Sequence, residues 1–429
     1  MTRRSSPKFV AAGVALVAAV ALSGCVTTSG AGGANTSGTD ADGPAVIQSR
    51  FTDEAKGGVP DLIAAFEAAG GGDIELNSVA SETYRQQLPT FLTSQTPPDG
   101  YTWFAGEATR SFANEGLLLD VSDVWDESLS DFPSALKKLS QDASGNEVFV
   151  PTNYYWWGVY YRVSEFERLG VEVPTTWEEF LDVSAKIKDQ GVTPITIGLS
   201  DNAWLASAWF DYLDIRINGG AYHLDLLAGK HSFEDQEVKD VFAAWTELLP
   251  YFDPSALGVS FTQSVSDLSQ GKAAMMLSGS YVQGSVPEDV LPDIGFFQFP
   301  TIDPSIPRAE EAPTDGFMAA ATSSRPKVIK EFMAFAASPE GEKIILKANG
   351  DSVLAANPNT DIELGPLAQQ GKEMLESADQ LTQFFNRDAG DEVQPSADAA
   401  LTQFFSDPDK IDEILATWQA EATKARESK

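Results

Sequence analysis

The aromatic side chains between Pro151 and Arg162 have the spacing that most clearly suggests binding chemistry, because six of these twelve residues are Tyr or Trp. Pro151 disfavours a helix just before it, and the aromatic and β-branched content favours an extended strand. A strand alternates its faces, so one face would carry Tyr155, Trp157, Val159 and Tyr161, and the other Trp156 and Tyr160. We predict that this strand crosses from one lobe into a second, with Tyr155 and Trp157 in a ligand cleft. The alternative is that these rings are core.

Motifs for covalent or metal chemistry are not found in the sequence. The only histidines, His223 and His231, lack the spacing of zinc ligands, and neither a Gly-x-Ser-x-Gly elbow nor a P-loop occurs. We therefore predict no catalytic residue, no metal and no cofactor.

The N-terminus has the pattern of a secretory signal peptide, which we place at residues 1–24. Three basic residues precede an apolar stretch that ends at Leu22 and is too short, and wrongly flanked, for a stable membrane span. The sequence Leu22-Ser23-Gly24-Cys25 resembles the bacterial lipobox, in which the cysteine is lipidated. Cys25 is the only cysteine in 429 residues, and lipidation would account for an unpaired thiol in an exported chain.

Residues 25–44 would be the lipidated cysteine and a flexible tether, since they are rich in Gly, Ser, Thr and Ala. About twenty such residues reach roughly 25 Å, so acylated Cys25 would hold a folded body at the outer face of the cell membrane without spanning it. Removal of the signal peptide takes away three positive charges and changes the formal net charge from −34 to −37. Such a surface repels nucleic acid and anionic lipid heads, and it argues weakly against an anionic ligand.

The residues after the tether are too many for one compact core and suggest two lobes. Strand-like and helix-like segments alternate, which predicts an α/β fold with parallel sheets covered by helices. The expected strands are 45–51, 73–79 and 100–104, and the expected helices are 59–69, 82–94 and 107–115. Ligands bind beyond the carboxyl ends of strands in such sheets. The residues at that edge would be Thr52, Asp53, Ser81, Glu82 and Ala105 to Glu107.

Further along, Thr176 and Glu179 have the spacing of a capping box at the start of a helix. Asp201 or Asn202 is expected to cap a helix that continues to Ile217. The other expected elements are helices at 238–249, 261–270, 327–337, 340–348 and 411–426, strands at 193–198, 273–277 and 293–299, and a loop at 300–313.

Short sequences spread along the chain resemble, in their order, the extracellular sugar-binding proteins of ABC importers, the family that includes maltose-binding protein. They are Pro98-Asp99, Trp103-Phe104-Ala105-Gly106-Glu107, Glu115-Gly116-Leu117-Leu118, Tyr160-Tyr161-Arg162, Pro174-Thr175-Thr176-Trp177-Glu178-Glu179-Phe180, Gly271-Lys272-Ala273-Ala274-Met275, Gly279-Ser280-Tyr281 and Thr314-Asp315-Gly316-Phe317. The resemblance is strongest to members associated with glucosides and other short oligosaccharides.

The resemblance implies a two-lobed fold of the periplasmic-binding-protein type, in which each lobe is a sheet flanked by helices and the ligand lies at the hinge. One lobe would comprise 45–153 plus 301–355, and the other 154–300 plus 356–429. Closure would be a hinge motion, recognised by the membrane subunits of the ABC permease. The protein would be a monomer, with a mono- to oligosaccharide, the permease and the lipid bilayer as partners, and without nucleic acid.

A sugar site needs aromatic faces for the C–H faces of a pyranose, and charged or amide groups for its hydroxyls. The predicted ligand-binding residues are Glu82, Glu107, Tyr155, Trp157, Trp204, Tyr281, Asp315 and Arg387. Tyr281 stands where the family commonly has Trp after Gly-Ser or Gly-Pro. The alternatives are a solvated helix charge for Glu107, a turn-forming Asp-Gly pair for Asp315 and a surface ion pair for Arg387.

Two other classes of protein compete with a sugar receptor. A membrane-anchored glycoside hydrolase would need only two carboxylates across a glycosidic bond, and the chain has 63 acidic residues. However, no acid and nucleophile motif of such enzymes is found. A structural surface adhesin would not require a cleft lined by Trp and acids.

Overall fold

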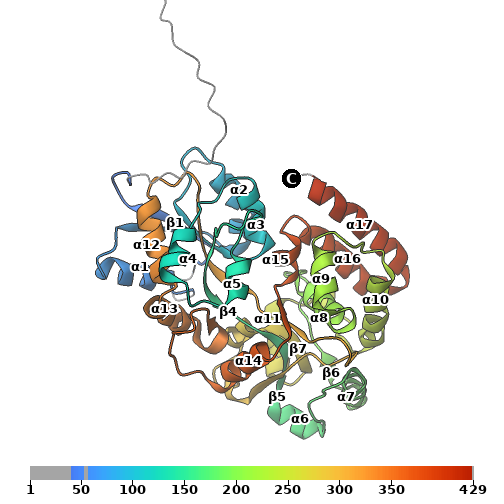
Figure 1. The fold of residues 1–429 in the computed structure, drawn as a ribbon. Coiled ribbons are helices and arrows are strands. Elements are labelled where there is room, and N and C mark those ends of the chain that lie inside the picture. The colour runs from blue at the N-terminus through green and yellow to red at the C-terminus, as the bar shows by residue number, and fades with distance from the viewer. Residues whose placement is uncertain (1–39, 53–56, 428–429) are drawn as a thin grey trace, which may run out of the picture. The chain divides into compact units, whose positions relative to one another are not determined.

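The computed structural model describes residues 40–52 and 57–427, except for the side chain of Glu82. The predicted signal peptide, Cys25 and Asp53 therefore lie outside the described residues. Within them the chain has an α/β fold with two main sheets, each flanked by helices, as predicted (Figure 1). No helix of this described part is both long enough and apolar enough to cross a membrane.

The larger sheet has six strands in the spatial order β11-β4-β10-β3-β1-β2. Their bounds are β1 (Ala45–Ser49), β2 (Ile74–Ser78), β3 (Gly100–Phe104), β4 (Val150–Tyr154), β10 (Thr314–Ala319) and β11 (Leu354–Ala355). β1 is parallel to β2 and β3, whereas β10 runs antiparallel between β3 and β4. The predicted parallel sheet is thus mixed, because a strand from much later in the chain is inserted beside β3.

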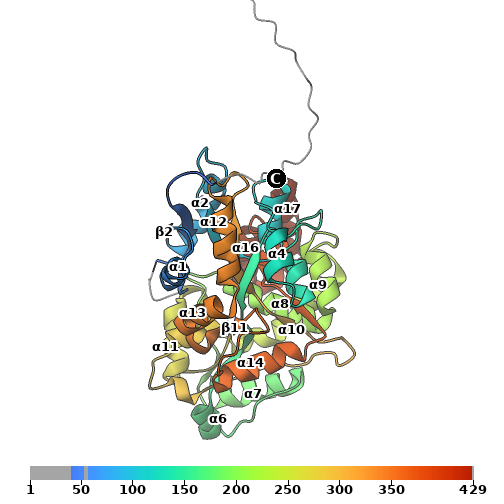
Figure 2. The ribbon, with the colours of Figure 1, turned by 60° about the vertical axis from the view of Figure 1, so that its left-hand side comes forward.

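Alternation along the strands places a separate core on each face of this sheet. One core joins it to α1 (Val59–Ala68), α4 (Ser122–Ser128), α5 (Ser134–Leu139), α12 (Pro326–Ala336) and α13 (Pro339–Asn349). The core of the other face includes α2 (Ser81–Leu92) and α3 (Glu107–Asn114). Figure 2 shows α1, α12 and α13 grouped on one side of the molecule. The helices predicted at 59–69, 82–94 and 107–115 correspond to α1, α2 and α3.

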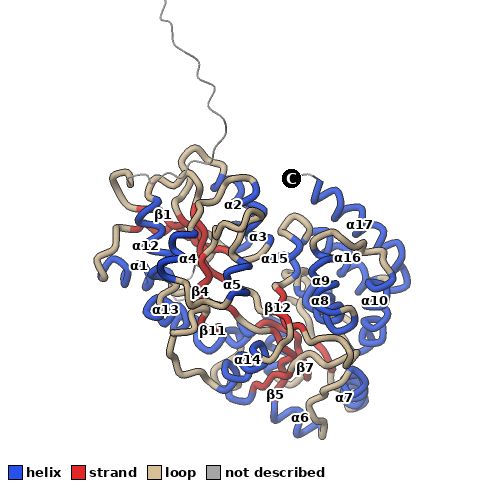
Figure 3. The backbone as a smooth tube through the Cα atoms, in the orientation of Figure 1, coloured by secondary structure: helices blue, strands red, loops and turns tan. Residues whose placement is uncertain are grey.

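The smaller sheet has four strands in the order β6-β7-β5-β8, namely β5 (Trp157–Arg162), β6 (Thr193–Ile195), β7 (Ala273–Gly279) and β8 (Ile294–Phe297). Figure 3 shows its strands as a group separate from those of the larger sheet. The surrounding helices are α6 (Val163–Leu169), α7 (Trp177–Asp189), α8 (Leu205–Ile217), α9 (Gly219–Leu227), α10 (Gln236–Leu248), α11 (Phe261–Ser269), α14 (Pro366–Glu376), α16 (Gln394–Ser406) and α17 (Ile411–Glu427).

Short elements complete the part of the chain that the structure describes. The strands β9 (Ala309–Glu311) and β12 (Gln380–Thr382) pair in parallel, and the five-residue helix α15 (Phe385–Ala389) follows β12. The 3₁₀ turns are Leu249–Tyr251, Ala256–Gly258, Ser280–Ser285, Leu291–Asp293, Gly350–Ser352 and Pro408–Lys410. β9 lies inside the segment predicted to be a loop, so that prediction is wrong at Ala309–Glu311.

The aromatic segment is divided between the two sheets. β4 ends at Tyr154 and pairs with β10 and β11, whereas β5 begins at Trp157 and pairs with β7 and β8. The prediction of one continuous strand is therefore wrong, because the backbone of Tyr155 bonds to Pro313 and that of Trp156 to Ser280. The predicted alternation is confirmed, with opposite cores receiving Trp157 and Trp156.

The two helix starts predicted from capping residues differ in outcome. The capping box of Thr176 and Glu179 is present at the start of α7, as predicted. The predicted cap of α8 is wrong, because the helix begins at Leu205 and no side chain caps it. Asp201 instead accepts a hydrogen bond from the backbone of Phe261, and Asn202 accepts one from the indole of Trp204. Both side chains are thus occupied elsewhere.

Candidate ligand-binding site

A cavity of about 400 Å³ is lined by residues of both main sheets and of the segments that connect them. Small-molecule sites commonly have volumes of roughly 300–1,000 Å³. The larger sheet contributes the C-terminal parts of β3 and β4 and the N-terminal part of β10, together with Arg50, which directly follows β1. The smaller sheet contributes the start of β5. The lining also includes residues of α15 and α16, so segments distant in the sequence meet at this cavity.

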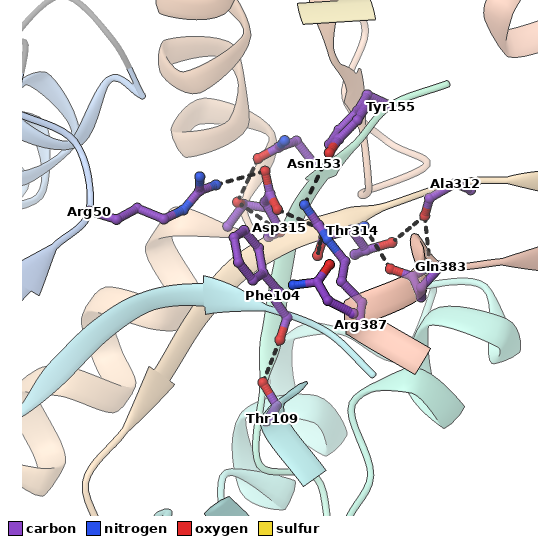
Figure 4. Close-up of polar contacts among 12 residues, drawn as sticks. Arg50, Phe104, Thr109, Asn153, Tyr155, Ala312, Thr314, Asp315, Gln383 and Arg387 are labelled. Atoms are coloured by element: carbon purple, nitrogen blue, oxygen red, sulfur yellow. Dashed lines mark hydrogen bonds and ion pairs between the residues drawn. The ribbon is translucent and has the colours of Figure 1, made fainter. Parts of the chain in front are cut away.

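One wall is built around Asp315, which lies between two arginines (Figure 4). Arg50 donates from Nη2 to Asp315 Oδ2, and Arg387 donates from Nη1 to Asp315 Oδ1, both at 2.9 Å. Arg387 also donates to the backbone oxygen of Thr314 at 3.0 Å and to the hydroxyl of Tyr155 at 3.1 Å. These bonds fix the carboxylate and both guanidinium groups in one arrangement.

The arginines of this wall also contact an aromatic ring. The guanidinium carbon of Arg50 lies 4.6 Å from the ring centre of Phe104, and that of Arg387 lies 4.1 Å from it. Arg387 is 5% exposed, so burial lowers its pKa, but the nearby Tyr155 and Asp315 outweigh burial and raise it overall. Burial raises the pKa of Tyr155 to about 12. Arg387 therefore stays charged and Tyr155 stays neutral at physiological pH.

The Asp315-Gly316 pair is part of β10 and does not form a turn. The register of β10 with β4 shifts between Asp315 and Gly316. A Cβ atom on Gly316 would lie 2.1 Å from the backbone oxygen of Val150, so only glycine allows the two strands to approach here. The turn interpretation of this pair is thus wrong, as is the surface ion pair proposed for Arg387, which is buried.

A second wall of the cavity is aromatic and consists of Trp157, Trp204, Tyr281 and Phe384. Trp157 and Phe384 are stacked with ring centres 5.1 Å apart, and Trp204 meets Phe384 edge-on at 5.4 Å. Tyr281 lies edge-on to Trp157 at 5.8 Å. Trp204 and Tyr281 are half-buried, whereas Trp157 is 1% exposed. Trp157 is therefore both core and cavity wall.

Comparison with known proteins relates this chain to proteins that bind solutes. Residues 52–343 match the family described as bacterial extracellular solute-binding protein. The chain belongs to this family.

The solved structure of the bacterial solute receptor AcbH, described as having an exclusive preference for β-D-galactopyranose, is similar with a TM-score of 0.84 and 28% identity. That similarity covers 89% of this chain and 98% of AcbH. A structure of a chitin oligosaccharide binding protein has a TM-score of 0.76 and 25% identity, covering 86% and 95% of the two chains.

Sequence relatives of this solute-binding protein include the alpha-glucosides-binding periplasmic protein AglE of Rhizobium meliloti, 24% identical over 73% of each chain. A probable sugar-binding periplasmic protein of the same organism is 26% identical over 50% of each chain. An uncharacterized ABC transporter extracellular-binding protein of Pyrococcus horikoshii is 23% identical over 65% of this chain, and the match spans 62% of that protein's length. The proteins that resemble this chain thus include receptors named for sugars and an extracellular-binding protein of an ABC transporter.

The structure brings together six of the residues predicted for the solute-binding site. The cavity is lined by Tyr155, Trp157, Trp204, Tyr281, Asp315 and Arg387. Glu107 is not among the lining residues; it lies in the first turn of α3, where it accepts a hydrogen bond from Arg110 at 2.9 Å. Glu82 lies in α2 next to Ser81, which lines the cavity, but its side chain is outside the described part.

Several lining residues were not predicted from the sequence. They include Arg50, Arg85, Phe104, Phe384, Asn386 and Gln394. Arg50 follows β1 directly, so the rule that places ligands at the carboxyl ends of strands could have included it. Phe384 precedes the predicted Arg387 by three positions, but nothing in its local sequence distinguishes it from the buried Phe385.

The described part of the lining provides several groups for binding and a single carboxyl group. Among the described lining residues, Asp315 is the only acid, whereas hydrolysis of a glycoside commonly uses a pair of carboxyl groups. In the described part of the chain, no group of three or more His, Cys, Asp or Glu side chains could hold a metal ion. The buried Nε of Arg50, Nε1 of Trp157 and Oε1 of Gln394 have no hydrogen-bond partner among the residues that the structure describes. These atoms provide unused donors and an acceptor next to the cavity.

Proposed function

We propose that this solute receptor captures a short sugar in the cavity between its two sheets and delivers it to the permease of an ABC importer. The combination of the Asp315–Arg50–Arg387 wall with the aromatic wall of Trp204 and Tyr281 carries the proposal. Sugar hydroxyls both donate and accept hydrogen bonds, so they fit a carboxylate next to guanidinium groups. The C–H face of a pyranose fits an aromatic surface.

The volume of the cavity and the ligands of similar proteins support a small sugar as the ligand. A cavity of about 400 Å³ has the size for a mono- or disaccharide, with one sugar ring against the aromatic wall. The described preference of AcbH makes β-D-galactopyranose one candidate, and the name of AglE makes α-glucosides another. We propose a glucoside or another short sugar of this size as the ligand. The protein would act without a cofactor and without catalysis.

Binding to a panel of D-galactose, D-glucose, maltose and N,N′-diacetylchitobiose tests this function. A sugar that binds only the folded protein raises the melting temperature, and calorimetry then gives its dissociation constant. We expect at least one member to bind and to be recovered unchanged by chromatography. Recovery of hydrolysis products would support the glycoside hydrolase instead, and an absence of binding across an extended sugar library would contradict the receptor.

We also propose that residues 1–24 are a signal peptide and that acylated Cys25 anchors the receptor as a monomer at the outer face of the cell membrane. The lobes would be 45–153 plus 301–355 and 154–300 plus 356–429. The strands of the two main sheets support this division, whereas β9 of the first lobe pairs with β12 of the second. The support for the anchor is the lipobox-like sequence that ends in the only cysteine of the chain.

Replacement of Cys25 by Ala tests the anchor. Without the thiol no acyl chain can be attached, so we expect C25A to move from the membrane fraction to the medium or the periplasmic fraction. Incorporation of labelled palmitate should be lost in parallel. Labelling that survives in C25A would show that another residue carries the lipid.

A further inference from the structure

The carboxyl group of Glu311 in β9 is fully buried, and neither of its oxygens has a hydrogen-bond donor in the described part of the protein. A buried carboxylate without a partner is costly, because burial removes the water that would stabilise its charge. The nearest explanation is a proton rather than a missing donor. A protonated carboxyl group can itself donate a hydrogen bond to a neighbouring acceptor.

That acceptor is Asp211 in the middle of α8, which is also fully buried. The carboxyl groups of Asp211 and Glu311 face each other within hydrogen-bonding reach. Among the described residues, none donates a hydrogen bond to Asp211 Oδ1. Two carboxylates at this distance repel each other, so a single shared proton both removes the repulsion and forms the bond.

The charged and titratable groups around the pair come from α8, α9, β9 and α15, and from the segments that contain Tyr155 and Tyr281. Nδ1 of His223 in α9 is hydrogen-bonded to Asp214 Oδ2 at 2.8 Å, and Nε2 of the same ring lies 3.8 Å from Asp211 Oδ1. Glu310 of β9 is paired with Arg216 of α8 at 2.5 Å. The remaining groups with an electrostatic influence on the pair or next to it are Tyr155, Tyr212, Tyr281, Arg387 and Asp388.

The pair is connected to the sugar cavity by one hydrogen bond. Asp211 Oδ2 accepts from the backbone nitrogen of Phe385 at 2.9 Å, and Phe385 is the first residue of α15. The residue before it, Phe384, stacks on Trp157 in the aromatic wall. Arg387, two residues further along, makes the bonds to Asp315 and Tyr155. Asp211 is therefore hydrogen-bonded to the start of α15, close in sequence to two residues that line the cavity.

We propose that Asp211 and Glu311 share one proton, and that this protonated pair is a positioning device that holds α15, and with it Phe384 and Arg387, in the sugar-binding arrangement. The proposal rests on the function proposed above. When the pair loses its proton, the two carboxylates repel, the bond from Phe385 to Asp211 weakens and the cavity loses its arrangement. Sugar affinity then falls as the pH rises.

The direction of proton binding agrees with this geometry. Burial raises the pKa of Asp211 to about 7, although the charge on His223 opposes the shift. Burial and the charge of Asp211 raise the pKa of Glu311 well above its usual value. Since both pKa values are raised, the folded protein keeps a proton on the pair that the unfolded chain, with ordinary carboxyl groups, has already lost. The pair therefore loses this proton at a higher pH than an ordinary carboxyl group does.

The test is the dissociation constant, from pH 5.5 to 8.5, of the tightest-binding sugar of the panel named above. For the wild-type protein we expect a constant value at low pH and a rise toward tenfold per pH unit above the pH at which the pair loses its proton, as for any single linked proton. In Glu311→Gln the amide donates to Asp211 in place of the proton, so affinity should stay high across the range. In Asp211→Asn the amide donates to Glu311 instead, so this variant tests the proposal if E311Q does not fold.

The control is Glu342→Gln, which removes another buried acid whose pKa is raised, in α13 and outside the cavity lining. This variant should retain the pH dependence of wild-type affinity. A pH dependence that is equal in E311Q or D211N and the wild type would overturn the proposal, as would a wild-type affinity that does not change with pH.

Hydrogen exchange of the Phe385 amide separates failure of this proposal from failure of the proposed function, because it needs no sugar. We expect the protection factor of this amide to fall from pH 6 to 8 in the wild-type protein but not in E311Q. Equal protection in both proteins would overturn the role of the pair even if a sugar binds. Absence of sugar binding, together with the expected exchange, would instead contradict only the link to the receptor function.

Discussion

Asp315 accepts hydrogen bonds from Arg50 and Arg387, so contacts within the protein itself fix the charged wall of the cavity. Preorganised groups lose less conformational entropy on binding than groups that must first be ordered. The bonds from Arg387 to Thr314 and Tyr155 add to this effect. At the scale of single residues, the site therefore combines fixed polar groups with aromatic rings of differing exposure.

The difference in exposure between Trp204 and Trp157 leads to different expected effects of their replacement by Ala. Trp204 is half-buried in the cavity wall, so W204A should weaken sugar binding by roughly 2–4 kcal/mol, or about thirtyfold to a thousandfold, as for other aromatic anchors. Trp157 is 1% exposed and belongs to a core, so W157A should lower the stability of the apo protein by about 3–5 kcal/mol. Calorimetry beside apo unfolding curves measures both quantities. Full affinity in W204A with a lowered melting temperature would mean that Trp204 is core as well.

Residue types and the family resemblance together predicted part of the cavity lining. Tyr155 and Trp157 could be predicted because aromatic residues are concentrated in one short segment, and Trp204, Tyr281, Asp315 and Arg387 because they lie in sequences that resemble one family. Arg50 could not be predicted in the same way, since its contact with Asp315 joins residues 265 positions apart. Glu107 has a suitable type and position in the sequence, but the start of α3 directs it to Arg110.

At the scale of elements, the break between β4 and β5 is the feature on which the site depends. Local propensity favours a strand throughout the aromatic segment, and both halves are strands. Each half joins the sheet of its partner strand, which is β10 for β4 and β7 for β5, and both partners lie far along the chain. Periodicity therefore predicted which face each ring occupies, but it could not predict that Tyr155 lies between two sheets.

Other elements also differ in whether nearby residues or distant contacts determine them. The capping box of α7 involves only residues close in sequence, so it was predictable. The helix α9 was missed because it begins with Gly219 and Gly220, which disfavour helices, and it is held by contacts with α8. The strand β9 was missed because it exists only through its pairing with β12.

The helix α13 carries a buried acid that makes stability depend on pH. Glu342 accepts hydrogen bonds from the backbone of Asn357 and the hydroxyl of Thr360, yet burial raises its pKa to about 8. The folded protein therefore binds a proton that the unfolded chain has released above its ordinary pKa of 4.5. The resulting stabilisation is fully present below that value and is lost as the pH rises to about 8, by an amount on the order of a few kcal/mol.

Urea unfolding at pH 5, 7 and 9 checks this prediction with Glu342→Gln as the comparison. The free energy of unfolding of the wild-type protein should fall more steeply with pH than that of E342Q. Parallel curves for the two proteins would show that Glu342 is ionised in the folded state at neutral pH.

At the scale of the whole molecule, global charge and local charge differ in sign. The chain has a formal net charge of −34, yet the described lining of the cavity contains three arginines and one aspartate. The acidic surface keeps the protein soluble and disfavours nucleic acid, but it does not determine what the cavity binds. Net charge therefore gave weak guidance about the ligand, because the folding of a few segments selects which charges face it.

The placement of one cavity between two sheets predicts a compaction of the whole protein on sugar binding. Asp315 belongs to the larger sheet, whereas Trp157 and Tyr281 belong to or directly follow strands of the smaller one, so a sugar that contacts both walls draws the lobes together. The segments near Asn153, Pro300 and Ala355 are the expected hinges. Small-angle scattering should show a smaller radius of gyration at saturating sugar. W204A at the same sugar concentration serves as the control, because a protein with an empty site should keep the radius of the apo form. An unchanged radius for the saturated wild-type protein would show that the sugar binds without hinge closure.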